Sequence, residues 1–341
     1  MKILFITCSS NPKRCGITDY VNLLSKELEK NGHMVEIETI DSVKDFAHIS
    51  KNLPSSDLYS LQFAPYAFSQ SGLSGKGLIT FAKSLTNKNT HINFHEIWIG
   101  AYPKATWKEK TIGWLQKREI INFINICKPS AITCSNSAAL DRMRQTGVDA
   151  KYLYLFGNIP YSPSKKDDSL NRLNIVFFGT LYERFPYDQL VKVLFHISQS
   201  LKKQIHITIL GRQRESEGLE CMKKVSQKHG FPITLSGELS ISKISEELQI
   251  SDLGISTTPY DIIGKSGTTA AMLEHGLPVL TFDDGDTPKN KLFVMQEYQD
   301  QVFLLNDSSV TQKLFSFLKK PRKTFFDGVA YTTKKMLEVI H

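Results

Sequence analysis

The sequence is poor in cysteine, and its cysteines follow none of the patterns that usually give them a function. There are five, an odd number, scattered between Cys8 and Cys221 without a C-x-x-C pair. This distribution argues against a disulfide framework and a cysteine-based zinc site, and it is typical of a reducing compartment. We therefore expect a cytoplasmic protein without a structural metal.

Long apolar runs are also missing. The apolar stretch at residues 1–7 is too short for a signal peptide, and no segment approaches the ~20 apolar residues of a membrane-spanning helix. Peripheral contact with the inner face of a membrane stays open, because residues 102–127 combine two tryptophans with five basic side chains. The alternative for this segment is an ordinary packed helix with a solvated face.

The chain lacks the short signatures of two large protein classes. No zinc-finger or basic-zipper pattern is present, so we expect no nucleic-acid partner despite a net charge of +8. The G-x-G-x-x-G fingerprint of redox dinucleotide binding does not follow the first expected strand. The basic excess instead suits an anionic small ligand or an anionic membrane surface.

What is present is a repeated alternation of short apolar runs with helical patterns, over a length typical of two domains. Strands expected at 2–7 and 34–40 flank a helix, which predicts a right-handed parallel unit. A second alternation starts at 174–178, after a polar segment at 161–173 that is typical of a linker. We expect two doubly wound α/β domains, at residues 1–160 and 174–320, and a last helix at 321–341.

One stretch, residues 256–281, organises the second domain. A strand at 252–256 leads into a loop with three helix-breaking residues, then a helix at 268–275 and another strand. Glycines before a helix let backbone N–H groups approach a ligand, and the helix N-terminus favours an anion. The alternative is an ordinary capped helix of any α/β protein. The predicted phosphate site consists of Gly264, Lys265, Ser266, Gly267, Thr268 and Thr269.

The end of this stretch carries a family resemblance. Residues 276–279, G-L-P-V, match the end of the pattern E-x-x-x-x-G-x-P-V. With the glycine-rich loop, the stretch resembles the nucleotide-sugar-binding signature of retaining glycosyltransferases with the GT-B fold, in particular family 4. The resemblance implies two Rossmann-like domains that face each other across a cleft. The two glutamates of the family pattern are absent, because Ile263 and Ala271 stand in their places. Glu274 is the substitute candidate for the ribose contact.

Two residues of the first domain carry further resemblance. Gly16, in R-C-G-I-T-D-Y, holds the place of the family's glycine loop, which faces the donor diphosphate and the acceptor. His95 follows the strand expected at 91–94, and ligands of open α/β sheets gather at carboxyl ends of strands. The resemblance implies that His95 lies near the reacting sugar as a catalytic residue. The alternative for Gly16 is a glycine required only by a turn. The alternative for His95 is a histidine whose hydrogen bonds are made within its own loop.

The second domain adds further candidates at strand ends. In the sequence, Arg184 is one residue away from the position of the family's diphosphate-binding lysine. Thr180 stands at a position where the family commonly has an arginine. Arg212 follows the next strand and is a second candidate for the diphosphate, since a guanidinium suits a phosphate well. For each arginine the alternative is a solvated surface charge. The segment that resembles the base-reading part of the family gives the nucleoside candidates Glu238, Leu239 and Ser240.

The resemblance implies transfer of a sugar from a nucleotide diphosphate donor, such as a UDP- or GDP-sugar, with retention and without a metal or cofactor. The acceptor would be a glycan, a lipid-linked molecule or a small molecule. Asp284-Gly285-Asp286 matches a metal motif of a different glycosyltransferase fold, and we interpret it as a solvated turn. Two alternatives stay open: a nucleotide-sugar isomerase or epimerase of the same architecture, and a non-catalytic nucleotide-sugar-binding subunit.

Overall fold

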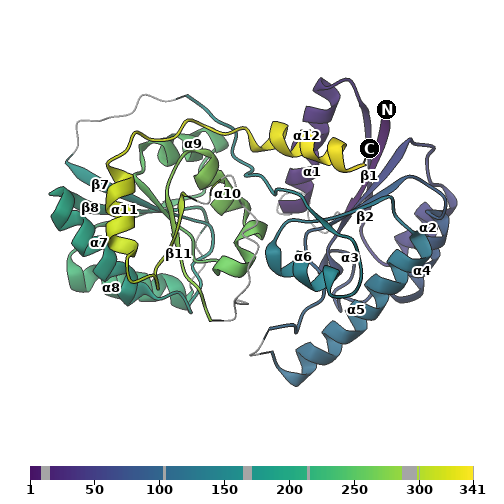
Figure 1. Cartoon of the computed structure of the whole chain (residues 1–341), viewed down its shortest axis with the longest axis horizontal. Helices are drawn as coiled ribbons and strands as arrows, with labels where there is room; N and C mark the ends of the chain where they lie inside the picture. The colour runs from purple at the N-terminus through teal and green to yellow at the C-terminus, as the bar shows by residue number, and fades with distance from the viewer. Residues whose placement is uncertain are drawn as a thin grey trace. The chain divides into compact units, whose positions relative to one another are not determined.

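Figure 1 shows the computed structural model of the chain, which describes residues 1–8, 16–102, 105–163, 171–212, 216–285, 298 and 300–340. The chain forms two compact units. The first comprises Met1–Tyr154 and Val329–His341, and the second comprises Leu155–Gly328. The sequence places the first boundary at residue 160, so the chain enters the second unit somewhat earlier than expected.

The first unit is built on a parallel six-stranded sheet in the order β2-β1-β3-β4-β5-β6. The strands expected at 2–7, 34–40 and 91–94 are present to within one residue. The strands are β1 (Lys2–Cys8), β2 (Met34–Ile40), β3 (Leu58–Phe63), β4 (Thr90–Phe94), β5 (Ala131–Cys134) and β6 (Lys151–Tyr152). The helices are α1 (Gly16–Lys30), α2 (Asp45–Lys51), α3 (Pro65–Phe68), α4 (Gly75–Ser84), α5 (Trp107–Cys127), α6 (Ser137–Arg144) and α12 (Gly328–Ile340).

Burial of both sheet faces explains why β1 reads as a continuous apolar run. The side chains of residues 3–6 are fully buried, as expected for a central parallel strand that is covered on both sides. On one face, aromatic side chains of α2, α4 and α5 meet those of β3 and β4, as in the packing of Phe81 and Phe63 with Phe123. The polar residues described below belong to the opposite face.

The second unit repeats the arrangement with a six-stranded parallel sheet in the order β12-β11-β10-β7-β8-β9. Helices α7, α8 and α11 pack on one face around a core that includes Leu190, Leu194 and Leu314. The strands are β7 (Arg172–Phe178), β8 (Gln204–Leu210), β9 (Ile233–Gly237), β10 (Leu253–Ile255), β11 (Val279–Thr281) and β12 (Val302–Leu304). The helices are α7 (Tyr187–Leu201), α8 (Glu217–His229), α9 (Ile241–Ile250), the 3-10 helix η1 (Tyr260–Lys265), α10 (Gly267–Glu274) and α11 (Val310–Leu318).

The last helix starts at Gly328, later than the start of the expected helix at 321–341. The Arg322 guanidinium explains the delay, because it donates hydrogen bonds to backbone carbonyls at the end of α9 and to the carbonyl of His275 after α10. This clamp holds the segment before α12 against the second unit. A helix expected at 289–298 lies outside the described residues, apart from Tyr298.

No helix in the described part of the chain has the length and apolar content needed to cross a bilayer. None of the cysteines that the structure describes forms a disulfide: Cys8, Cys127, Cys134 and Cys221.

Candidate functional site

Each sheet has one point where the order of its strands reverses. In the second unit, β7 and β10 are neighbours, and the chain continues from β7 toward β8 but from β10 toward β11. In the first unit the corresponding neighbours are β1 and β3. Ligands of open α/β sheets bind beyond the carboxyl ends of the strands at such reversals. The candidate residues of each unit are therefore judged by their position relative to these strand ends.

The predicted phosphate site lies beyond the end of β10, at the start of α10. Ser266 caps the helix by accepting a hydrogen bond from the Thr269 N–H (3.2 Å), and the Thr269 hydroxyl donates to the Ser266 Oγ (2.8 Å). Ser256, directly after β10, lies 2.7 Å from the same Thr269 hydroxyl. Among the described residues, none accepts a hydrogen bond from the N–H groups of Gly267 and Thr268. The first turn of α10 is thus held at the end of β10, and the N–H groups of Gly267 and Thr268 remain available to a ligand.

The loop after β7 packs directly on this first turn. Gly179 has φ +97°, and a Cβ added there would lie 3.1 Å from the Thr268 Oγ1. The Thr257 hydroxyl donates to the Thr180 carbonyl (2.7 Å), which joins the loops that follow β7 and β10. Gly179 was not among the predicted site residues, although its signal was available: a glycine follows the strand where the chain must turn with a positive φ.

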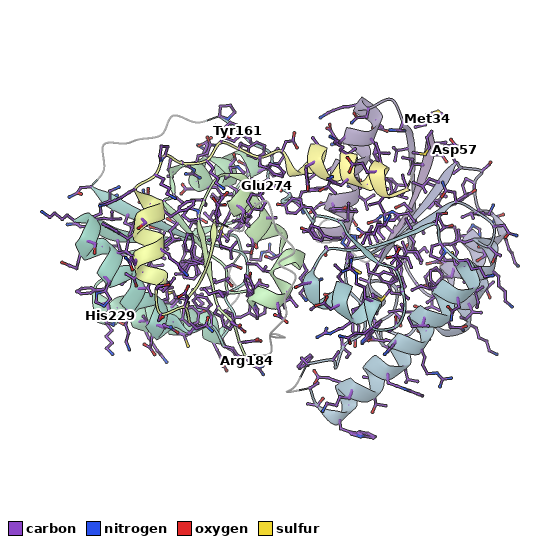
Figure 2. All side chains as sticks on the ribbon, in the orientation of Figure 1. Met34, Asp57, Tyr161, Arg184, His229 and Glu274 are labelled. Atoms are coloured by element: carbon purple, nitrogen blue, oxygen red, sulfur yellow. The ribbon has the colours of Figure 1, made fainter. Side chains whose placement is uncertain are left out.

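The predicted cations of the second unit have different surroundings. Arg184 is exposed and bonds to no described residue (Figure 2). Arg212 donates to Glu238 at 2.8 Å, so a diphosphate candidate and a nucleoside candidate form an ion pair with each other. Lys265 is exposed at the end of η1.

The remaining nucleoside candidates lie at the start of α9. The Ser240 hydroxyl caps this helix by accepting from the Lys243 N–H (3.3 Å), and Leu239 is half-buried. The hydroxyl of Ser240 therefore already has a structural partner, and the proposed contact of this segment with a nucleoside stays a prediction.

Glu274 lies in surroundings that do not support the predicted ribose contact. Its side chain is 2% exposed, and Oε1 accepts a hydrogen bond from the Gly157 N–H at 2.9 Å. Its carbonyl accepts from the Phe326 N–H (2.9 Å), and a Cβ on Gly328 would overlap with its carboxylate. The carboxylate is enclosed by backbone and therefore joins segments of the second unit instead of facing a ligand.

The positions of the two missing family glutamates are filled with buried apolar side chains. Ile263 is 4% exposed and Ala271 is fully buried. Gly157 approaches Ala271 so closely that a Cβ on Gly157 would lie 2.5 Å from the Ala271 Cα. A longer side chain at Ala271 would displace this backbone, so the loss of the second glutamate is linked to local packing.

In the first unit, His95 lies beyond the end of β4, next to the end of β3. Its backbone N–H donates to the Phe63 carbonyl (3.0 Å), and its ring meets the Tyr20 ring edge-on at 5.1 Å. The side chain is 5% exposed, and burial lowers the pKa of His95 to about 4. The imidazole is therefore neutral near pH 7.

Five buried side chains beside His95 form a closed ring of hydrogen bonds. They come from alternate positions of three adjacent strands, which places them on one sheet face: Ser60, Gln62, His91, Asn93 and Thr133. The Gln62 amide donates to Ser60 (2.9 Å), Ser60 lies 3.0 Å from His91 Nδ1, and His91 Nε2 lies 2.9 Å from Thr133. Thr133 donates to Asn93 Oδ1 (2.9 Å), and Asn93 donates back to Gln62 Oε1 (3.0 Å).

This ring determines which nitrogen of His95 carries the proton. With the amides oriented as in the structure, Gln62 presents only its Oε1 to His95, and His95 Nε2 lies 2.9 Å from it. An amide oxygen can only accept, so Nε2 is the protonated nitrogen and Nδ1 carries the lone pair. Asn93 Nδ2 is 3.4 Å from Nε2, too far to compete with this bond. Among the described residues, none bonds to Nδ1 of His95.

Sequence reasoning found His95 but missed the ring. The signal was polar alternation with a period of two, at residues 60 and 62, at 91, 93 and 95, and at 133 and 135, in or just after strands whose other positions are apolar apart from Thr90.

The last two sequence predictions concern loop residues. Gly16 is the exposed first residue of α1, and the residues before it lie outside the described part of the chain. The Gly285 N–H donates to Asp283 Oδ1 (2.9 Å), as in a local turn, whereas Asp286 is not described. Among the described residues, no three His, Cys, Asp or Glu side chains are grouped as metal ligands.

Comparison with known proteins gives structural neighbours only. The scan of family models gave no match, and the search of curated proteins gave none. Sucrose-phosphate synthase from Thermosynechococcus elongatus matches with a TM-score of 0.59 and 13% identity, over 100% of this chain and 96% of that protein. HepE from Anabaena, in complex with UDP and glucose, matches with a TM-score of 0.55 and 16% identity, over 99% and 98%.

Two further neighbours differ in what they bind or catalyse. An alpha-glucosyltransferase in complex with UDP and a 13-mer DNA matches with a TM-score of 0.54 and 10% identity, over 100% of this chain and 99% of that one. A protein assigned as a UDP-N-acetylglucosamine 2-epimerase from Listeria monocytogenes matches with a TM-score of 0.51 and 10% identity, over 99% and 95%. These likenesses show the fold: two Rossmann-like α/β units of the GT-B glycosyltransferase type, as the sequence predicted.

Proposed function

We propose that this chain is a glycosyltransferase that moves a sugar from a nucleotide diphosphate donor to an acceptor, with retention of configuration and without a metal ion. The observation that carries the proposal is the contact of Gly179 with the first turn of α10, where the strand order reverses between β7 and β10. The fold neighbours support it, since several of them were solved with UDP.

The donor diphosphate would bind at the start of α10. The free N–H groups of Gly267 and Thr268 and the positive end of the helix dipole favour an anion there. Gly179 lets the backbone approach closely, and the exposed cations Lys265 and Arg184 add positive charge to the same unit. Preorganised donors of this kind stabilise a leaving diphosphate as its charge develops, and they would do so without a metal. The proposal includes no side-chain nucleophile.

His95 would orient the reacting sugar. Because its pKa is lowered to about 4, it is neutral at pH 7, and its Nδ1 lone pair can accept a hydrogen bond from a sugar hydroxyl. Such positioning lowers the barrier by holding the reacting groups in the right geometry. His95 therefore acts in this proposal as a neutral acceptor and not as a cation.

The acceptor is proposed only by class, as a glycan, a lipid-linked molecule or a small molecule. One neighbour was solved with DNA, which weakens the sequence-based exclusion of nucleic acid. DNA therefore belongs in the panel of acceptors to be tested.

The second candidate function is a nucleotide-sugar epimerase, favoured by the epimerase among the structural neighbours. An epimerase changes the donor sugar without any acceptor, whereas a transferase releases a nucleoside diphosphate and forms a new glycoside. The two reactions are therefore distinguished by their products.

The test is product analysis after incubation with UDP-, GDP-, ADP- and dTDP-sugars, with and without acceptors, in buffer with EDTA and again with Mg²⁺ or Mn²⁺. We expect nucleoside diphosphate release that depends on an acceptor and survives EDTA, and a product whose anomeric configuration by NMR matches that of the donor. An altered donor sugar formed without acceptor would establish the epimerase. Donor binding without any turnover would establish a non-catalytic subunit.

A further inference from the structure

Helix α5 exposes large apolar side chains over its first half. Trp107 is 83% exposed, Trp114 is 55% exposed and Leu115 also reaches the solvent. A capping box formed by Thr106 and Glu109 fixes the start of this helix, so these side chains are displayed on an ordered element. Exposed tryptophans of this extent are unusual on the surface of a soluble protein and mark interaction sites.

The surroundings of these tryptophans are strongly basic. The two acidic side chains of the same segment already have partners, because Glu109 accepts from Tyr102 and Thr106 while Glu119 accepts from the N–H groups of Ser74 and Gly75. Among the described residues, no ion pair neutralises the nearby cations of α4 and α5: Lys76, Lys83, Lys108, Lys110, Lys117 and Arg118. The surface therefore keeps a net positive charge, because the six cations outnumber the two carboxylates, whose hydrogen-bond donors are neutral.

A groove of about 1050 Å³ lies between α4 and α5. Its lining combines aliphatic side chains, such as Ile79, Leu115 and Ile121, with cations at Lys76, Lys83 and Arg118. Figure 1 shows α5 as the long helix of the first unit, with α4 beside it. We call this surface the α4–α5 face; it comprises the groove, Trp107, Trp114 and the cations named above.

We propose that the α4–α5 face docks this protein on a bilayer that contains anionic lipids. Tryptophan side chains favour the membrane–water interface, and cations near an anionic leaflet gain about 1 kcal/mol each. The aliphatic side chains in the groove suit acyl chains, and its cations suit anionic headgroups, whereas single-stranded nucleic acid uses aromatic rings as stacking platforms. Trp114, the one aromatic ring that lines the groove in the described structure, is covered by Arg118 at 4.8 Å. This inference does not depend on the proposed sugar transfer.

The first test is cosedimentation of the full chain with vesicles of phosphatidylcholine, with and without phosphatidylglycerol. We expect binding that requires phosphatidylglycerol and weakens as salt is raised, since screening reduces the attraction. Tryptophan emission should shift to shorter wavelength on binding, because Trp107 and Trp114 would leave water while Trp98, 7% exposed, keeps its surroundings. Absence of binding to the anionic vesicles would overturn the proposal.

Paired variants test whether this face makes the contact. Trp107→Ala with Trp114→Ala, and separately Lys108→Glu with Lys110→Glu, should each lower the partition coefficient at least about tenfold. Matched controls on the second unit are Phe195→Ala, which removes another exposed aromatic ring, and Lys224→Glu with Lys228→Glu on α8. The controls should bind as the wild type does, and circular dichroism should show that all variants are folded.

Two results would contradict the assignment. An equal loss of vesicle binding in the variants of the α4–α5 face and in the controls would show that net charge or nonspecific hydrophobic contact explains the binding. Retention of a single-stranded oligonucleotide through the same residues, without retention of vesicles, would show that the face binds nucleic acid instead of lipid.

Discussion

At the scale of single residues, the tautomer of His95 is set by a partner that is distant in sequence. Gln62 Oε1 accepts from His95 Nε2 and is itself held by the ring of buried side chains. Gln62→Met keeps the side-chain length but removes the acceptor. We expect ¹⁵N NMR to show the proton on Nε2 of His95 in the wild type and a mixture of tautomers in the variant, with lower turnover and unchanged nucleotide affinity. His95→Asn identifies the resonances. A wild-type proton on Nδ1 would contradict this account.

Gly179 offers a second test at this scale. A side chain there is strained at φ +97° and would press on Thr268, so Gly179→Ala should disturb the first turn of α10. We expect the dissociation constant for the donor nucleotide to rise at least about tenfold, or ~1.4 kcal/mol. Gly230→Ala is the matched control, because Gly230 also has a positive φ (+70°) but open space around it. Equal affinities in the two variants, measured by calorimetry, would remove Gly179 from the site.

Site residues could be predicted from the sequence where the residues that interact are close together in the chain. The hydroxyls and glycines at the start of α10 are neighbours in sequence, so the sequence alone could group them. The ring beside His95 joins three strands, and Glu274 meets Gly157 across 117 residues. Contacts between such distant residues cannot be predicted before the fold is known. For this reason the burial of the Glu274 carboxylate was not expected from the sequence.

At the scale of elements, Glu274 ties α10 to the backbone at Gly157. Glu274→Ala would leave the buried Gly157 N–H without its acceptor, so the free energy of unfolding should fall by about 1–3 kcal/mol. Glu274→Gln keeps an acceptor oxygen and should cost less. Urea unfolding measures both, and nucleotide affinity of the folded variants should stay close to wild type. A stable Glu274→Ala variant that loses nucleotide affinity would restore the ribose contact.

The elements that the sequence predicted well are those with a strong local period. The strands expected at 2–7, 34–40 and 91–94 were found to within one residue. Helix α7 was not expected from the sequence, although Leu190, Leu194 and Ile197 mark its buried side at helical spacing. The start of α12 could not be foreseen, because the Arg322 clamp depends on carbonyls of two distant helices.

At the scale of the whole molecule, buried histidines should make stability depend on pH. Burial lowers the pKa of His91 to about 3 and those of His95 and His275 to about 4, from an ordinary 6.5. Between these values and 6.5 the unfolded chain binds more protons than the folded one. Their stabilising contribution is thus complete above pH 6.5 and is lost as the pH falls toward 4, by about 1.4 kcal/mol per pH unit for each histidine.

Urea unfolding at several pH values between 7 and 4 would measure this loss. In His275→Asn the slope should be shallower, since one of the three groups is gone. An unchanged slope in the variant would show that His275 already binds its proton in the folded state.

The whole account rests on a nucleoside diphosphate that binds where β7 and β10 meet. The most direct measurement is calorimetric titration of the full chain with UDP, GDP, ADP and dTDP, followed by the monophosphate and the nucleoside of the one that binds. We predict selective binding of one diphosphate in the presence of EDTA, and an affinity that falls at least about tenfold for the monophosphate, because the second phosphate loses the N–H groups at the start of α10. Absence of binding by all four, with or without Mg²⁺ or Mn²⁺, would contradict the proposed donor site.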